Sequence, residues 1–518
     1  MTNKPKGKTS SSVDASSSSD GAATTWNVLV YMAADNNLKE ESVYNLNEML
    51  EAHKASESLN VAAQLSASNR TANLKPRSVK SDFKVTAQLD SGDAVRLFDF
   101  NDAKKKATAK RAEEGLEAVG AEVVSNPQIL QRLSDSEMLR QFLEQRLVKD
   151  KLNLVVLSGH GSGAVGDFMT TNTPPSALSI PDIRSVLTSV RRKVDRKIDV
   201  LGMDSCLMSM AEVGYELRET VDYLVGSEGF SRNAGWPYRQ ILSKLKDEQA
   251  IEPKDCARMI VREYMHFYAP YTLAGVSVDQ AACDLTKIGE LKEPMTVLSD
   301  TLCEKLKKEA TEPEENREVE KAVILAHWKA QSYKLEQYVD LWDFCDLLAK
   351  FCKDKQVVSA CGKVKEAICG ESGDADDRAV LLSCYSGAAF QYSKGLSIYF
   401  PWAKSDLDRN LRFYEELAFS RDTHWGEFLA LYGAQTQRKF NTSALHKSGT
   451  PVEVPMLVEA EIGSVRSNLL ENTRSNLLEN TRSNLLENTR FGQIMIPMVK
   501  NPPDSFLKYE DDCAINAS

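Results

Sequence analysis

The chain has 518 residues, of which 42% are hydrophobic and 27% are charged, a composition typical of a soluble globular protein. Lys and Arg number 64 and Asp and Glu 74, so the formal net charge is −10. This charge argues against a protein that coats nucleic acid, because such a surface must be basic. No apolar run approaches the roughly 18 residues of a membrane span. We therefore expect neither nucleic acid nor membrane as a partner.

The first 25 residues predict a disordered head. They are polar and rich in Ser, and they contain no apolar segment of the signal-peptide kind. Such a segment cannot bury enough surface to offset the entropy lost on ordering. On this basis we expect a cytoplasmic protein.

The cysteines do not predict a disulfide scaffold or a zinc site. Ten Cys are spread over 518 residues, which is sparse, and no Cys-x-x-Cys pair occurs. Several lie in apolar runs, where Cys behaves as a small hydrophobic residue. The sequence therefore predicts no metal site and no required cofactor.

Ordered structure is predicted from Trp26 onward. An apolar strand over residues 26–32 precedes a helix over 40–50 and a second strand over 59–65. This strand–helix–strand order is typical of a parallel sheet. Residues 83–87 and 95–100 have the pattern of further strands.

The same α/β pattern continues to about residue 240. Strands are expected at 151–157, 198–203 and 223–226, and helices at 138–147 (capped by Ser134), 181–190 and 208–217. The predicted fold class is therefore α/β, with a mostly parallel central sheet flanked by helices.

Four segments are expected along the chain: the head (1–25), the α/β core (26–240), a mainly helical region (241–435) and a tail (436–518). The helical region has a late hairpin-like strand pair, at 379–385 and 395–400, followed by a helix at 411–419. The tail holds three copies of one octapeptide. They begin at Arg466, Arg474 and Arg482. They are either a repeat expansion in a tolerant tail or a short interaction arm.

Two reactive side chains follow predicted strands. His160 lies in a Gly-rich turn after the strand at 151–157, and Cys206 comes just after the strand at 198–203. The carboxyl ends of parallel strands meet at one edge of a sheet, where reactive groups gather. A Cys nucleophile needs a nearby base, and His is the usual partner. The backbone N–H groups of Gly161 and Cys206 are candidates for an oxyanion hole, and the predicted helix after Cys206 would favour a thiolate.

These motifs resemble the clostripain family of cysteine peptidases. The resemblance rests on the order and separation of short matching stretches, at 26–38, 160–163, 202–208, 227–228, 235–238 and 395–401. It implies a caspase-like fold and a cysteine endopeptidase that acts on protein or peptide substrates, with a dyad of His160 and Cys206. Family members are often zymogens, and some respond to calcium.

The resemblance also implies that Asp204 lines a pocket for a basic P1 side chain, the residue before the cleaved bond. Asp204 as a helix-capping turn residue is the alternative. The family usually has a second acidic residue just before the Gly-Trp-Pro-Tyr element, but this chain has Ala234 there, with Arg232 nearby. Cleavage after Arg or Lys is therefore an inherited expectation that Ala234 weakens.

The basic run at 191–197 lies between the two dyad residues. It is either a solvated turn or a site of self-cleavage. Two other functions remain open for the whole chain. One is a signalling or scaffold protein that binds partners through its tail, and the other is a Cys-dependent amidase using the same dyad.

Overall fold

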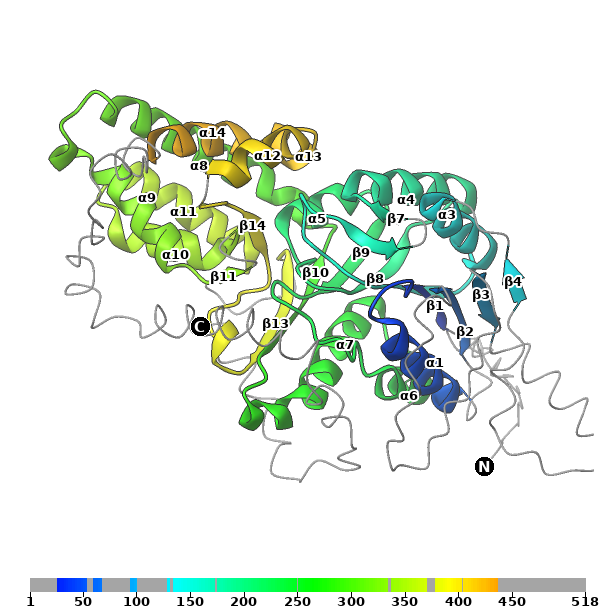
Figure 1. Cartoon of the computed structure of the whole chain (residues 1–518). Coiled ribbons are helices and arrows are strands. Elements are labelled where there is room, and N and C mark those ends of the chain that lie inside the picture. The colour runs from blue at the N-terminus through cyan, green and yellow to red at the C-terminus, as the bar shows by residue number, and fades with distance from the viewer. Residues whose placement is uncertain are drawn as a thin grey trace, which may run out of the picture.

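The computed structural model describes residues 26–53, 59–67, 94–99, 128–130, 134–172, 175–248, 250–333, 337–369, 378–402 and 404–436 (Figure 1). The predicted head (1–25), the predicted strand at 83–87 and the octapeptide repeats lie outside these residues.

A nine-stranded sheet forms the centre of the molecule, in the order β13-β10-β9-β8-β5-β1-β2-β3-β4. Its strands are β1 (Trp26–Ala33), β2 (Asn60–Ala67), β3 (Ala94–Asp99), β4 (Gln128–Leu130), β5 (Leu152–Ser158), β8 (Ile198–Asp204), β9 (Val221–Gly226), β10 (Val278–Asp284) and β13 (Val380–Ser386). The strands from β9 to β2 in this order run parallel, and the outer strands pair antiparallel. The predicted mostly parallel sheet is confirmed.

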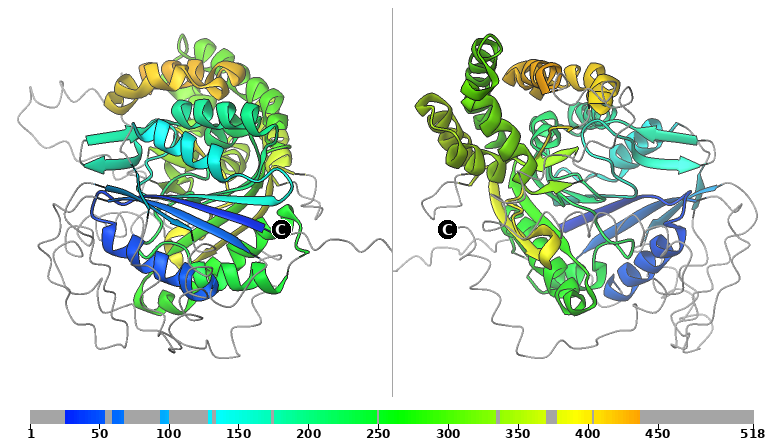
Figure 2. Two further views of the ribbon diagram at one scale, coloured as in Figure 1. Left: turned by 90° about the vertical axis from the view of Figure 1, so that its right-hand side faces the viewer. Right: turned by 60° about the vertical axis from the view of Figure 1, so that its left-hand side comes forward.

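Helices cover both faces of this sheet (Figures 1 and 2). One face carries α1 (Lys39–His53), α6 (Tyr238–Asp247) and α7 (Pro253–Tyr268), and the other carries α3 (Asp135–Arg146), α4 (Ile180–Val194) and α5 (Ala211–Leu217). Side chains alternate along a strand, so β1 contributes to two cores. Val28 and Val30 pack in the core under α1 and α6, whereas Leu29 and Tyr31 pack in the core under α3 and α4. The helix-flanked arrangement expected from the sequence is confirmed.

Local side-chain and backbone contacts set the ends of α3 and α4. Ser134 caps α3 by accepting a hydrogen bond from the Glu137 amide, as expected. Ser179 and Asp182 form a capping box at the start of α4, and Asp195 ends that helix in a left-handed conformation. Residues 191–194 of the basic run are therefore helical.

The region after residue 240 adds helices and a second sheet. The small sheet has the order β11-β12-β14, from β11 (Ser332–Tyr333), β12 (Tyr338–Asp340) and β14 (Ser397–Tyr399). The other elements are the hairpin β6 (Phe168–Asn172) and β7 (Pro175–Leu178), the helices α8 (Lys292–Glu309), α9 (Glu318–Lys329), α10 (Leu341–Phe351), α11 (Lys355–Ile368), α12 (Lys404–Glu415), α13 (Ala418–Thr423) and α14 (Trp425–Thr436), and the short 3-10 helices Ala269–Ala274, Ile288–Leu291, Glu314–Asn316 and Ala388–Phe390.

The late strand pair is not the hairpin that the sequence suggested. β13 joins β10 in the central sheet, whereas β14 pairs with β12 in the small sheet. A short 3-10 helix and Gly395, at φ +103°, turn the chain between the two strands and send β14 away from β13. The helix expected at 411–419 is likewise divided into α12 and α13. Both corrections reflect tertiary pairing that a local pattern does not contain.

The central sheet also extends past residue 240, because β10 and β13 both belong to it. Among the described residues, no helix has the length and apolar character that crossing a bilayer requires.

Candidate active site

His160 and Cys206 line one hollow at the carboxyl ends of the central strands. In the register of β5 and β8, Ser158 lies opposite Asp204, so the segments that follow these strands leave the sheet side by side. The hollow, of about 400 Å³ including its open mouth, lies where these segments meet the start of α1 and the loop after β9. The sequence prediction that strand ends bring the two residues together is consistent with this placement.

The His160 ring is held by the loop that follows β1. Its Nε2 atom lies 2.6 Å from Oδ1 of Asn37. The backbone is fixed as well, because the carbonyl of His160 accepts a hydrogen bond of 2.9 Å from the Met169 amide. In a neutral imidazole whose Nε2 donates to Asn37, Nδ1 carries the lone pair that can accept a proton.

Cys206 is partly exposed, but its thiol keeps its proton in this conformation. Its Sγ atom donates to the carbonyl oxygen of Ser231 at 3.7 Å. Burial raises the pKa of the thiol to about 11, and the charge of Asp204 adds to this, whereas Arg232 opposes it. At neutral pH the sulfur therefore keeps its proton until a base removes it.

Cys206 does not lie at the start of a helix, so the predicted stabilisation of its thiolate by a helix dipole is wrong. The helix after Cys206 begins at Ala211, not at Met208, and Cys206 lies in a turn before it. Leu207 takes a positive φ of 63°, which interrupts the helical path directly after the cysteine. Because the helix field is strong only within its first turn, α5 does not stabilise a Cys206 thiolate.

A hydrogen-bonded loop after β9 supports the turn that carries Cys206. The Leu207 amide donates to the Gly229 carbonyl at 2.9 Å, and Ser231 Oγ donates to the Ser205 carbonyl at 3.1 Å. The buried carboxylate of Asp279 accepts hydrogen bonds from the amides of Glu228 (2.6 Å) and Gly229 (3.0 Å) and so fixes this loop. These contacts fix Ser205 and Leu207, the residues on either side of Cys206.

The proposed oxyanion donors lie close together. A Cβ atom on Gly161 would overlap the carbonyl oxygen of Cys206 and would lie 3.2 Å from its amide nitrogen. Within the part of the chain that the structure describes, neither the Gly161 amide nor the Cys206 amide donates a hydrogen bond. Only glycine fits this approach, and both N–H groups are available to a ligand oxygen.

Asp204 is buried beside Cys206 and does not cap a helix. Its Oδ2 atom accepts hydrogen bonds from Ser158 Oγ at 3.1 Å and from the Tyr238 hydroxyl at 2.8 Å. Burial raises its pKa to about 6, although hydrogen bonds from Tyr238, Ser158 and the Trp236 backbone lower it. Asp204 is therefore largely ionised at neutral pH and forms part of the hollow's wall.

The sequence did not predict that three further residues would contact the site. Asn37 binds the imidazole, Ser231 accepts from the thiol, and Tyr338 of β12 donates to the Ser162 carbonyl at 2.6 Å. The asparagine pair in the turn after β1 was the one signal present, since polar residues at strand ends point to sites. Tyr338 and Ser231 contact the site only through the tertiary fold.

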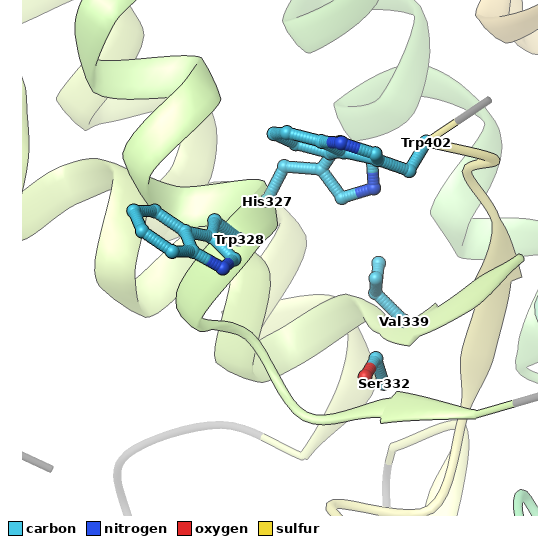
Figure 3. Close-up of a pocket in the computed structure, with 5 residues that line it drawn as sticks. All are labelled: His327, Trp328, Ser332, Val339 and Trp402. Carbon is cyan, nitrogen blue, oxygen red and sulfur yellow. The ribbon is translucent and has the colours of Figure 1, made fainter. Parts of the chain in front are cut away.

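A second hollow, of about 220 Å³, lies far along the chain from these residues. It is lined by His327, Trp328, Ser332, Val339 and Trp402 (Figure 3). Burial lowers the pKa of His327 to about 3, so the ring is neutral, and it stacks on Phe400 with ring centroids 3.7 Å apart. His327 is therefore a buried core residue.

Metal ligands do not gather in the described ranges, where no group of three or more His, Cys, Asp or Glu side chains is arranged to hold an ion. Within those ranges the side chains form no such cluster for calcium, and we derive no step through it.

Comparison with known proteins identifies the chain. The architecture is the caspase-like α/β fold of the C11 cysteine proteases. A secreted C11 cysteine protease from Bacteroides thetaiotaomicron, solved with an irreversible peptide inhibitor, is 16% identical and superposes with a TM-score of 0.50, over 78% of this chain and 99% of its own. An inactive zymogen C11 protease from Parabacteroides distasonis is 17% identical, with a TM-score of 0.48, over 77% of this chain and 98% of its own.

The sequence profile of the clostripain family matches residues 30–432. Clostripain from Hathewaya histolytica is 24% identical over 240 residues, 42% of this chain and 42% of clostripain, so the match spans less than half of that relative. Because the profile covers most of the chain, this protein belongs to the clostripain family of cysteine peptidases.

Proposed function

We propose that the chain is a cysteine endopeptidase that uses His160 and Cys206 as a catalytic dyad. The observation that carries the proposal is the presence of both side chains in one hollow, next to two free backbone amides of the described structure, those of Gly161 and Cys206. Thiol, imidazole and amide donors are the groups that acyl transfer requires.

The first half of the reaction forms an acyl-enzyme. His160 takes the proton of the Cys206 thiol as the sulfur attacks the carbonyl carbon, so that an S–C bond forms. The oxygen of the tetrahedral intermediate then lies where the amides of Gly161 and Cys206 can donate to it. The C–N bond breaks, and the imidazolium returns its proton to the leaving amine.

The second half of the reaction regenerates the enzyme. Water, deprotonated by His160, attacks the thioester carbonyl, and the S–C bond breaks to release the acid product. The proton then returns to the Cys206 sulfur. Because burial raises the pKa of this thiol to about 11, His160 must remove the proton during attack rather than before substrate arrives.

We further propose that the P1 residue is basic. Asp204 supplies a buried carboxylate beside Cys206, and Arg or Lys is the side chain that such a carboxylate pairs with. The pocket lacks a carboxylate at Ala234, so specificity depends on what else lines the hollow.

The proposal is tested by labelling with a peptidyl ketone inhibitor that carries a P1 arginine, followed by intact-mass measurement and peptide mapping. We expect one adduct, on Cys206, in the wild-type chain and in Cys303→Ala, and none in Cys206→Ala. Cys303 is a suitable control because it is also a partly exposed free thiol with a pKa that burial raises to about 11. Labelling that persists in Cys206→Ala would overturn the assignment of the nucleophile.

A further inference from the structure

We propose that Glu41 and Asn45 of α1 form the wall of the P1 pocket opposite Asp204 and that together they select arginine. This inference rests on the proposed function, since it names the recognition residues of the same site. It concerns side chains that lie far in sequence from the Gly-Trp-Pro-Tyr element, where a second acidic residue was expected.

Glu41 and Asn45 face the same hollow as the dyad. Both belong to α1, which begins at Lys39, just after the loop that carries Asn37. Residues four apart in a helix lie on one face, so these two side chains point to the same side. Both line the hollow together with Cys206 and Asp204.

Asn45 has an unused acceptor at this wall. The residue is 3% exposed. Among the described residues, its Oδ1 atom has no hydrogen-bond partner. Buried polar atoms in folded proteins are almost always paired, and an exception at a binding site indicates a group that a ligand satisfies. An N–H donor is the group that an amide oxygen requires.

The side chains of Asn45 and Asp204 both lie close to the backbone of Gly235. A Cβ atom on this glycine would lie 2.8 Å from Nδ2 of Asn45 and 2.9 Å from Oδ2 of Asp204. Gly235 also has a φ of +71°, which favours glycine. Only glycine therefore lets this loop approach Asn45 and Asp204 so closely, and it places both side chains at the same part of the hollow.

The lining of this hollow matches a guanidinium group. Asp204 and Glu41 contribute carboxylate oxygens, and Asn45 contributes an amide oxygen, so the wall is rich in acceptors. The cation on the same hollow, Arg232, donates from Nη2 to the Ser277 carbonyl at 2.8 Å and is thereby drawn toward the start of β10. A guanidinium presents five N–H donors in a plane and can serve several acceptors at once, whereas an ammonium presents three on a point charge.

Glu41 also resolves the difficulty raised by Ala234. A pocket with Asp204 alone holds a single carboxylate beside Arg232, which would weaken its preference for a cation. With Glu41 the lining holds two carboxylates, and the second comes from the first helix rather than from the loop before Trp236. The pocket therefore keeps its acidic character by a different route.

The test compares kcat/KM for three fluorogenic peptides that differ only at P1, which is arginine, lysine or norleucine. We expect the wild-type chain to prefer arginine over lysine and both over norleucine. Glu41→Gln should lower kcat/KM for arginine and lysine by roughly 10- to 100-fold and leave norleucine unchanged. Asn45→Leu, which keeps the side-chain size, should lower the arginine-to-lysine ratio by roughly tenfold.

Glu51→Gln is the matched control, because Glu51 is an exposed residue of the same helix and should keep the wild-type ratios. Unchanged ratios in both Glu41→Gln and Asn45→Leu, in a wild-type chain that cleaves after arginine, would overturn this inference and leave the proposed function intact. If Asn45→Leu does not fold, Glu41→Gln alone decides, since its side chain is only partly buried. A wild-type chain that cleaves only after norleucine would instead overturn the basic-P1 proposal, and this inference with it.

Discussion

Oδ1 of Asn37 lies 2.6 Å from Nε2 of His160, although 123 positions separate the two residues. The contact joins the loop after β1 to the loop after β5. It sets the orientation of the imidazole that the proposed mechanism pairs with Cys206. In the proposed mechanism we therefore assign Asn37 as a positioning residue that acts through His160.

Replacing Asn37 with alanine should lower kcat by roughly 10- to 100-fold with little change in KM, because the imidazole loses its orientation but the P1 pocket keeps its lining. Steady-state kinetics with an arginyl peptide checks this. Asn47→Ala is the control, since Asn47 lies on α1 and donates to the Val43 carbonyl within that helix. A tenfold rise in KM with an unchanged kcat would show that Asn37 binds substrate instead.

The selectivity for basic residues should depend on pH through Asp204. Burial raises the pKa of this carboxyl to about 6, so below that pH it becomes protonated and no longer attracts a cation. The ratio of kcat/KM for a P1-arginine peptide to that for a P1-norleucine peptide should therefore be constant near neutrality and fall as the pH drops through about 6. The ratio cancels the ionisation of Cys206 and His160, which affects both peptides equally. A flat ratio in acid would contradict the role of Asp204.

Much of the central sheet could be predicted from the sequence, because its parallel strands are buried on both faces and appear as continuous apolar runs. β1, β5 and β8 are of this kind. β10 could not be found in the same way, since its sequence mixes Asp279, Gln280 and Asp284 with small residues. That strand is fixed by pairing with β9 and β13 rather than by its own pattern.

The candidate site, too, could be predicted only in part from the sequence. His160, Cys206, Gly161 and Asp204 follow directly on buried strands, so their convergence was predictable from strand ends. Asn45 gave no such signal, because a polar residue in an amphipathic helix is usually solvated. Its burial, and an oxygen with no partner among the described residues, arise only once α1 packs over the end of the sheet.

The small sheet should influence catalysis through Tyr338, whose hydroxyl donates to the Ser162 carbonyl in the His160 loop. Tyr338→Phe should cost about 1 kcal/mol of unfolding free energy and lower kcat several-fold, since a buried carbonyl loses its donor and the loop loosens. Urea denaturation and kinetics check the two effects. Tyr333→Phe is the control, because its hydroxyl bonds to Ser393 within the C-terminal region. Equal effects of both variants on kcat would contradict a specific link between Tyr338 and His160.

The basic run at 191–197 should stay uncut in active enzyme. Residues 191–194 are the last turn of α4, and a protease needs an extended segment. Lys193 pairs with Glu144 at 2.8 Å and Arg196 pairs with Asp199 at 2.6 Å, so the segment is held on both sides of the turn. Peptide mapping of a fully active preparation should therefore recover this stretch intact. Quantitative cleavage within it, rising together with activity, would support self-cleavage instead.

The central claim is that Cys206 performs peptide hydrolysis after a basic residue. The most direct measurement is digestion of a positional-scanning peptide library by the wild-type chain, with Cys206→Ala and Cys303→Ala treated in parallel. We predict cleavage after arginine, more weakly after lysine, by the wild type and by Cys303→Ala, and none by Cys206→Ala. Cleavage that survives in Cys206→Ala, or no cleavage of any peptide by the wild-type chain, would contradict the claim.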